Sequence, residues 1–408
     1  MKERIIFHID VNNAFLSWTA VYLLKNGYKI DIRNIPSIIG GDEKTRRGIV
    51  LAKSPVAKKY GIVTAETIYQ AKRKCPSLKM YPPNYEWYAK KSKELFDYLS
   101  QYSPLIEKFS IDECFIDMTG TNYLYNDIEE LAHKIKDEIK KKFGYTVNIG
   151  IANNKLCAKM ASDFEKPDKV HTLYKSEIET KMWPLNVGDL FMCGKATTKA
   201  LNEMKIFTIK DLAYSNQKLL EKKFKSQAKY LKEAAWGIDT SKVEPRKEKN
   251  TSISTTQTLE HDCSDEIKLK NILLRQTEQV TRQLRQKKQY AKTVAVIYKN
   301  KDFKSYSAQA KLPKASNNTK DIYKLVVEIF EKSYLKKAIR LIGVRLADLC
   351  DNELEQISLF SDANKNTLKE DKIQSTIDNL NQKFGYGLIM PASFQVIANI
   401  DKEKVTKK

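Results

Sequence analysis

Residues 109–117 read FSIDECFID, an apolar stretch with an aspartate and a glutamate side by side in its middle. Two adjacent carboxylates in an apolar run are costly to bury unless something positive compensates them. The apolar residues also change phase at the acids, since Phe109 and Ile111 precede them and Cys114 and Ile116 follow. In one continuous strand these two sets would lie on opposite faces. The pattern therefore predicts a hairpin.

The predicted hairpin turns on Asp112 and Glu113. Such a turn restores one apolar face by pairing residues across it, Ile111 with Cys114 and Phe109 with Ile116. Two-residue turns favour Asn-Gly or Asp-Gly because they need positive φ angles. An acidic turn without glycine therefore predicts local strain, which is characteristic of functional sites. The segment alone leaves the alternative open that the two acids simply face water.

A third carboxylate, Asp10, ends the short apolar run RIIFHIDV at residues 4–11. Phe7 and Ile9 of this run can pack beside the hairpin, which would bring three carboxylates to the rim of one sheet. Oxygen ligands of this kind suit Mg²⁺. Two such ions about 4 Å apart activate a hydroxyl and stabilise a leaving oxygen in an in-line phosphoryl displacement. The residues therefore indicate phosphoryl transfer, without naming a substrate.

The composition points to a polyanionic partner. Formal net charge is +22, from 72 Lys and Arg against 50 Asp and Glu, which suits nucleic acid or an anionic membrane surface. A merely lysine-rich proteome is the alternative. No apolar stretch reaches the roughly 18 residues of a membrane span. The start, MKERIIFHID, leaves no room for a signal peptide, and the 6 scattered cysteines are typical of a reduced cytosolic protein.

The length of 408 residues predicts two to four domains. Residues 185–211 read as short helices around a glycine turn, compatible with a helix-hairpin-helix. Residues 241–250, SKVEPRKEKN, carry mostly charge and proline and read as a linker. The segment 251–350 follows a β-α-β-β-α-β pattern and holds about ten more basic than acidic residues. It is predicted to be an independent basic domain.

Several longer motifs resemble those of Y-family DNA polymerases of the bacterial DinB/UmuC kind. The resemblance extends from the N-terminus to about residue 350 and is carried by HIDVNNAF, GGDEKTRRGIV, AKKYGI, FSIDECFIDMTG, NIGIANNKLCAKMASDFEKPD and ISTTQTLEHD. It implies a mixed α+β fold shaped as a right hand, with an added little-finger domain. The implied domains are a palm at 1–12 and 83–170, small fingers at 13–82, a helical thumb with a helix-hairpin-helix at 171–240, a linker at 241–250, the β-α-β-β-α-β little finger at 251–350 and a tail at 351–408.

The resemblance also implies the chemistry. Asp10, Asp112 and Glu113 would bind two Mg²⁺ ions, for which Mn²⁺ can substitute, with the backbone carbonyl of Val11 nearby. The 3′-hydroxyl of a primer on template DNA would attack the α-phosphate of a dNTP, and pyrophosphate would leave. The expected protein is a monomeric translesion polymerase of the bacterial cytoplasm, associated with the nucleoid and not with a membrane.

Further roles follow from position within the family motifs. Phe15 falls at the steric gate, an aromatic ring that excludes a ribose 2′-hydroxyl, although core packing is an alternative. Lys58 and Lys159 fall at triphosphate-binding positions, although either could be a solvated surface charge, and Ala52 could lie against the nascent base pair. Two departures matter: the family usually has Arg at position 58, whose bidentate fork Lys lacks, and it often has an aromatic residue within Ser54–Pro55.

Two further regions suggest macromolecular contacts. Gln356, Leu359 and Phe360 in QISLF resemble the peptide that bacterial partner proteins insert into the β sliding clamp. An aromatic and a leucine anchor together in a polar tail favour a docking role. In the thumb only Gly194 remains of the usual glycine pair that contacts duplex phosphates. The basic little finger would follow phosphates without reading sequence.

Two other functions compete with this interpretation. Residues 40–44, GGDEK, resemble the GGDEF signature of diguanylate cyclases, but the run continues TRRG and a cyclase leaves the FSIDECFID hairpin unexplained. The second is a non-catalytic DNA- and clamp-binding accessory protein on a polymerase scaffold. That alternative predicts damaged metal carboxylates, and all three acids are present.

Overall fold

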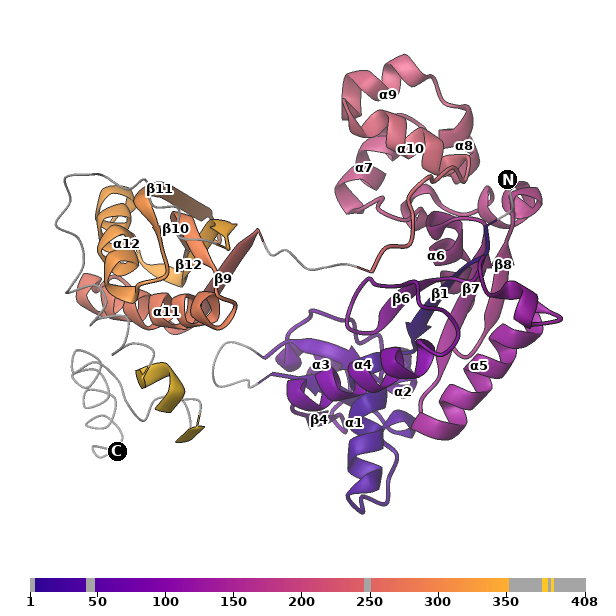
Figure 1. Ribbon diagram of the computed structural model, residues 1–408, viewed down its shortest axis with the longest axis horizontal. Coiled ribbons are helices and arrows are strands. Elements are labelled where there is room, and N and C mark those ends of the chain that lie inside the picture. Colours follow the sequence, from indigo (N-terminus) through magenta and orange to yellow (C-terminus); the bar gives the residue numbers. More distant parts are fainter. Residues whose placement is uncertain (1–3, 42–47, 246–250, 352–375, 381–382, 385–408) are drawn as a thin grey trace. The chain divides into compact units, whose positions relative to one another are not determined.

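The computed structural model describes residues 4–41, 48–245, 251–351, 376–380 and 383–384. The described residues before 246 form one compact unit and those from 251 onward form a second. Figure 1 traces the chain through both. The predicted mixed α+β class is what the structure has, with three separate sheets and helices packed on them. Among the described helices, none is long and apolar enough to cross a membrane.

A five-stranded sheet is the centre of the first unit. Its central strand β1 pairs antiparallel with β6 on one side and β7 on the other. All six residues of β1 are buried, as expected for a strand with both faces covered. In spatial order the strands are β5 (Ile106–Lys108), β6 (Glu113–Asp117), β1 (Ile6–Val11), β7 (Val147–Ala152) and β8 (Val170–Leu173).

The two faces of this sheet have different roles. Phe7 and Ile9 of β1 pack with α4 (Tyr85–Leu99) and α5 (Ile128–Phe143) in one apolar cluster. Side chains alternate along a strand, so His8 and Asp10 lie on the opposite face. That face is covered by α6 (Lys155–Asp163). The polar residues of the otherwise apolar strand β1 therefore face α6.

A smaller three-stranded sheet follows β1 along the chain. Helix α1 (Ala14–Lys25) leads into it, and Asn13 at the start of α1 donates from Nδ2 to the carbonyl of Lys53, 2.7 Å away. This contact ties the end of β1 to the smaller sheet. The remaining elements are a 3₁₀ turn (Ile32–Asn34), β2 (Ser37–Gly40), β3 (Val50–Lys53), α2 (Pro55–Lys59), α3 (Ile68–Lys74) and β4 (Lys79–Tyr81).

The first unit ends in a helical region that shares its apolar core with α6. Its four α-helices are α7 (Lys195–Glu203), α8 (Ile209–Tyr214), α9 (Gln217–Phe224) and α10 (Gln227–Ala235), preceded by short helical turns at Lys175–Glu177, Ile178–Met182 and Val187–Asp189.

The chain after α10 remains attached to the first sheet. Val243 is buried, and the backbone N–H of Glu244 donates to the Glu107 carboxylate at 3.2 Å. Lys155 donates to the same carboxylate at 2.7 Å. Residues 241–245 of the expected linker are thus held by the first unit.

The second unit has the β-α-β-β-α-β order that the sequence predicts. Its four strands form an antiparallel sheet in the order β11-β10-β12-β9, and both helices pack on one face of it. The elements are β9 (Ser252–Cys263), α11 (Glu266–Gln286), β10 (Tyr290–Asn300), β11 (Ser305–Ser316), α12 (Thr319–Ser333) and β12 (Ile339–Cys350). Gln356, Leu359 and Phe360 lie outside the described residues.

One glycine decides how closely α6 packs on the sheet. Gly150 of β7 lies opposite His8, and a Cβ placed there would be 2.0 Å from the carbonyl oxygen of Ala158 and 2.5 Å from the amide nitrogen of Ser162. These are backbone atoms of α6, so the helix would have to move.

We therefore expect Gly150→Ala to lower the free energy of unfolding by about 1–3 kcal/mol or more through overpacking. Chemical denaturation measures this. Gly120→Ala is the control, since a Cβ there has no neighbour within 4 Å, and it should change stability by about 0.5 kcal/mol or less. Equal effects of the two substitutions would contradict the close packing of α6.

Candidate active site

The hairpin forms, but its predicted register is wrong. β5 and β6 pair Lys108 with Cys114 and Ile106 with Ile116, whereas the sequence pattern predicts pairs of Ile111 with Cys114 and Phe109 with Ile116. Residues 109–112 make a four-residue loop, and Glu113 is already the first residue of β6. The backbone N–H groups of Phe109 and Ser110 both donate to the carbonyl of Glu113, at 2.9 and 3.1 Å. This closure fixes the longer loop.

The prediction of strain at the acids is also wrong. None of residues 109–113 has a positive φ angle. The hydroxyl of Ser110 accepts from the backbone N–H of Glu113 at 3.1 Å and donates to Oδ1 of Asp112 at 2.6 Å. A serine side chain that bonds nearby backbone groups stabilises a turn in the ordinary φ range. The hydrogen bonds of Ser110 therefore stabilise this loop, and none of its residues needs a positive φ angle.

The three predicted carboxylates meet at one end of the sheet. Asp10 on β1 is directly opposite Glu113 on β6, and the backbone N–H of Val11 donates to the carbonyl of Asp112 at 3.1 Å. Side chains of directly opposed residues project to the same face of a sheet. Asp10 and Glu113 therefore share the face that carries α6, with Asp112 in the adjoining loop.

Cations from distant parts of the chain compensate two of these acids. Lys159 on α6 donates to Oε2 of Glu113 at 2.8 Å, and Nε2 of His8 lies 3.2 Å from the same oxygen. Lys166, after α6, forms an ion pair with Asp10 and a second with Asp163. Of the two acids in the apolar run, Glu113 therefore has its counter-charge from α6, whereas Asp112 is held by the hydroxyl of Ser110.

The same contacts shift the pKa values of the acids in opposite directions. Burial alone would raise the pKa of Glu113, but hydrogen bonds from His8 and Lys159 lower it to about 2. Burial raises the pKa of Asp112, and repulsion from Asp10 and Glu113 raises it further against the hydrogen bond from Ser110. Among the contacts of the described residues, Asp112 is thus the acid without a paired cation. A bound cation would stabilise the charged form of Asp112 most.

The donor set fits divalent metal ions. All three acids offer oxygen ligands, the kind that Mg²⁺ prefers. The ammonium groups of Lys159 and Lys166 lie beside Glu113 and Asp10, so two of the acids already bind a positive charge. Within the described residues, no group of three or more His, Cys, Asp or Glu side chains is arranged to hold a metal ion. In this structure Lys159, Lys166 and Ser110 engage the three carboxylates.

Phe15 and Ala52 lie in one apolar cluster between α1 and the smaller sheet. The Phe15 ring is partly buried and stacks on Tyr88, with ring centroids 4.6 Å apart and an interplanar angle of 12°. The hydroxyl of Thr19 donates to the carbonyl of Phe15 at 2.7 Å and lies 2.7 Å from the hydroxyl of Tyr88. These contacts hold the Phe15 ring against Tyr88, which is compatible with a steric gate and equally with a core residue.

Lys58 is placed differently from the other predicted site residues. It is exposed in the last turn of α2, and among the described contacts none joins it to the three carboxylates. At Ser54, where the family often has an aromatic residue, the side chain is buried and caps α2 by accepting from the N–H of Ala57 at 2.9 Å. This capping role accounts for a serine there.

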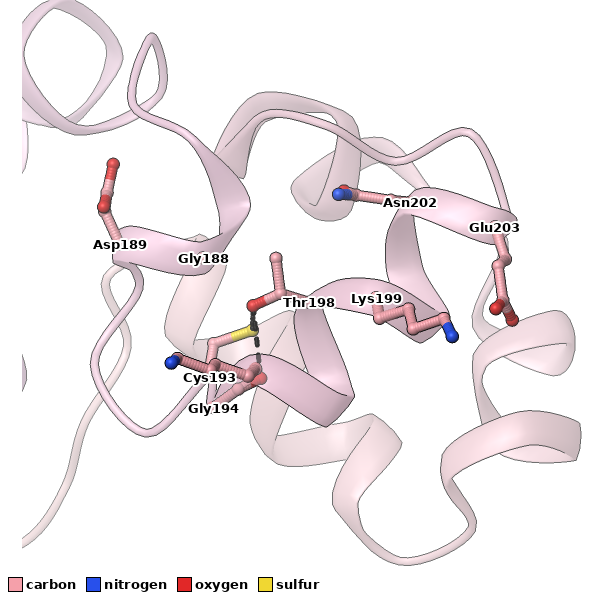
Figure 2. Close-up of a pocket in the computed structure, with 9 residues that line it drawn as sticks. Gly188, Asp189, Cys193, Gly194, Thr198, Lys199, Asn202 and Glu203 are labelled. Atoms are coloured by element: carbon pink, nitrogen blue, oxygen red, sulfur yellow. Dashed lines mark hydrogen bonds between the residues drawn. The ribbon is translucent and has the colours of Figure 1, made fainter. Parts of the chain in front are cut away.

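Figure 2 shows a cavity within the region of the predicted helix-hairpin-helix, residues 185–211. Gly188 and Gly194 lie on opposite sides of a cavity of about 830 Å³ whose wall includes Thr198 and Lys199 of α7. A Cβ at Gly188 would lie 3.0 Å from the methyl carbon of Thr198. Two lysines, Lys195 and Lys199, and two acids, Asp189 and Glu203, also line the cavity.

Comparisons with known proteins identify the family. The model of the impB/mucB/samB family matches residues 9–163, and that of its C-terminal domain matches residues 250–359. DNA polymerase IV of Clostridium acetobutylicum is 45% identical over 388 residues, which cover 95% of this chain and 97% of that protein. DNA polymerase IV 1 of Bacillus subtilis is 34% identical, covering 95% and 92% respectively.

The chain belongs to the impB/mucB/samB family. Solved structures agree on the fold: a Y-family DNA polymerase chimera, Dbh-Dpo4(243-245)-Dbh, is 24% identical with a TM-score of 0.73 and covers 85% of this chain and 100% of its own. An insertion ternary complex of Dbh DNA polymerase is 25% identical with a TM-score of 0.60, at the same coverage. The predicted DinB-type Y-family DNA polymerase is confirmed, and with it the enzyme class of a DNA-directed DNA polymerase.

Sequence reasoning missed three residues that contact the acids or support such a contact. Lys166, His8 and Ser162 all lie within motifs that carry the family resemblance, but no local pattern assigns them to the acids. A buried amide pair supports them: Asn12 donates to Asn148 at 3.0 Å, and Asn148 donates to the carbonyl of Ser162 at 3.0 Å. This pair fastens the end of α6 to the sheet.

The raised pKa of Asp112 predicts a stability effect that depends on pH. A carboxyl with a raised folded pKa contributes stability below its unfolded pKa, and this is lost as pH rises through the folded value. Asp112→Asn should therefore melt at a higher temperature than wild type at neutral pH without metal, and the difference should shrink towards about pH 4.

Thermal denaturation at several pH values measures this difference. Glu260→Gln is the matched control, because Glu260 is exposed on β9 of the second unit, and its melting temperature should follow that of wild type. A lower melting temperature of Asp112→Asn at neutral pH would show that the charged form stabilises the fold.

Proposed function

We propose that this polymerase is a translesion enzyme that adds dNTPs to a primer 3′-hydroxyl on template DNA by two-metal phosphoryl transfer, releasing pyrophosphate. The observation that carries the proposal is the meeting of Asp10, Asp112 and Glu113 at one strand end. Relatives named DNA polymerase IV and the ternary complex of a Dbh polymerase support the same substrates.

In this mechanism Asp10, Asp112 and Glu113 would hold two Mg²⁺ ions, and the carbonyl of Val11 could supply a further oxygen ligand. The ions would supply Lewis-acid activation of the hydroxyl and neutralise charge on the leaving phosphates. Lys159 and Lys166 leave the carboxylates and bind the triphosphate, since cations that neutralise phosphate charge stabilise the leaving group. The lysine side chains are long enough to exchange one anion for another while α6 stays in place.

The proposed domains follow the family hand. The five-stranded sheet is the palm, α1 to β4 the fingers and α7 to α10 the thumb, while the second unit is the little finger. The thumb cavity at Gly188 and Gly194 suits a primer phosphate. The helix-free face of the β9–β12 sheet carries small and polar residues, among them Ala295, Gly343 and Ser254, where DNA backbone can approach closely.

Primer extension tests the proposed function. Full-length protein, a labelled primer on a template, the four dNTPs and Mg²⁺ should give extended products, and Asp112→Asn should reduce the rate by a factor on the order of 100 or more. Glu129→Gln serves as control here, since Glu129 is exposed on α5. Absence of extension by the wild type, or undiminished extension by Asp112→Asn, would sink the proposal.

Phe15 is proposed as the steric gate. Phe15→Ala should raise incorporation of rNTPs relative to dNTPs on the order of tenfold or more, because the ring that meets the 2′-hydroxyl is removed. Single-nucleotide incorporation with matched dNTP and rNTP pairs measures the ratio. Tyr22→Ala on the same helix is the control. An unchanged ratio in Phe15→Ala would leave the ring a packing role alone.

Clamp tethering is proposed from the tail motif QISLF. Binding of Gln356, Leu359 and Phe360 to the β sliding clamp would raise the effective concentration of the polymerase at the primer end. Joint replacement of Leu359 and Phe360 by alanine should abolish stimulation of extension by a bacterial β clamp and leave clamp-free extension unchanged. Retained stimulation would refute the motif. The bacterial cytoplasm and a monomeric state are further expectations of the family.

A further inference from the structure

His8 is a buried histidine that the proposed mechanism does not use. Its side chain is completely inaccessible to solvent, yet it lies on the face of β1 that carries Asp10. Nε2 is 3.2 Å from Oε2 of Glu113, and Nδ1 is 2.7 Å from the hydroxyl oxygen of Ser162. Both ring nitrogens thus have a partner, and one of these partners is a proposed metal ligand.

The chemistry of Glu113 fixes the direction of its hydrogen bond with His8. An ionised carboxylate only accepts, so Nε2 of His8 must carry the proton towards Glu113. On the other edge of the ring, Nδ1 lies 2.7 Å from the hydroxyl oxygen of Ser162, and that hydroxyl donates to the carbonyl of Lys159 at 2.8 Å. Ser162 is itself buried in α6, which holds its hydroxyl in place. Ser162 therefore holds one edge of the ring, while the Glu113 carboxylate at the other edge decides that Nε2 carries a proton.

We propose that His8 is a positioning residue that keeps the Glu113 carboxylate oriented for metal binding. In this structure Oε2 of Glu113 has two donors, Lys159 and His8. The proposed mechanism moves Lys159 to the triphosphate, and His8 is then the donor that remains on this oxygen. The inference rests on the proposed metal site and adds to it the residue that orients one ligand.

A donor behind a metal ligand has a characteristic energetic effect. Removing such a hydrogen bond typically weakens metal binding or activity by about 10–100-fold, because the ligand loses its preferred orientation. Packing alone predicts something different for His8. Its ring lies 4.7 Å from that of Phe115, so an apolar ring of similar size should preserve a purely structural role.

Two substitutions separate these roles. His8→Phe keeps an aromatic ring against Phe115 but removes the N–H, whereas His8→Gln loses the ring but can present an amide N–H where Nε2 lies. The positioning role predicts that His8→Gln binds metal better than His8→Phe, and packing alone predicts the reverse order. His133→Gln is the matched control, since His133 is exposed on α5.

The test measures Mn²⁺ binding by electron paramagnetic resonance, which does not depend on turnover. Full-length protein is mixed with a primer-template ending in a dideoxynucleotide and the matched dNTP, and Mn²⁺ is titrated. We expect the dissociation constant to rise at least about tenfold in His8→Phe and clearly less in His8→Gln. His133→Gln should match wild type.

The outcomes distinguish failure of the proposed metal site from failure of the role proposed for His8. Absence of Mn²⁺ binding by wild type would overturn the metal site and this inference together. Normal binding by wild type with equal binding by His8→Phe, or weaker binding by His8→Gln than by His8→Phe, would overturn the inference alone. If His8→Phe does not fold by circular dichroism, His8→Ala takes its place, because it also lacks the N–H, and Mn²⁺ binding by His8→Ala as tight as that by His8→Gln would refute the role of the N–H.

Discussion

Repulsion among Asp10, Asp112 and Glu113 is the constraint around which the first unit is organised. The antiparallel pairing of β1 with β6 brings the acids together, and burial followed by repulsion from Asp10 and Glu113 raises the pKa of Asp112. Such a cost persists only where the surrounding structure over-determines the arrangement. Here the surroundings are a sheet packed on both faces and a helix, α6, seated against Gly150 without room for another carbon.

The elements of the fold were largely predictable because hydrophobic periodicity is a local signal. The β-α-β-β-α-β order of the second unit and the helices flanking the first sheet follow from spacing alone. The hairpin at Asp112 and Glu113 was predictable from the phase change, but its register was not. The alternation of apolar and polar residues does not give the number of residues in the loop. The loop length is set by the hydrogen bonds of Ser110 and by those that the carbonyl of Glu113 accepts.

The site was predictable in its acids and not in their partners. Asp10, Asp112 and Glu113 stand out because carboxylates in apolar strands are unusual. Lys159 is 46 residues from Glu113 and Lys166 is 156 residues from Asp10, and one lysine among 72 basic residues carries no such signal. His8 is a similar case, because a buried histidine in a strand reads as a core residue until its two hydrogen bonds are known.

The pairing of Lys159 with Glu113 and Lys166 with Asp10 makes nucleotide entry an ion exchange. In the proposed mechanism, cations arriving with a triphosphate would displace these two ammonium groups, which would then neutralise the phosphates. Few bulk counterions need to be released or recruited in such an exchange. Contacts between lysines and duplex phosphates differ, because each releases condensed counterions. Added salt should therefore separate the two binding steps, weakening the hold on DNA much more steeply than the hold on nucleotide.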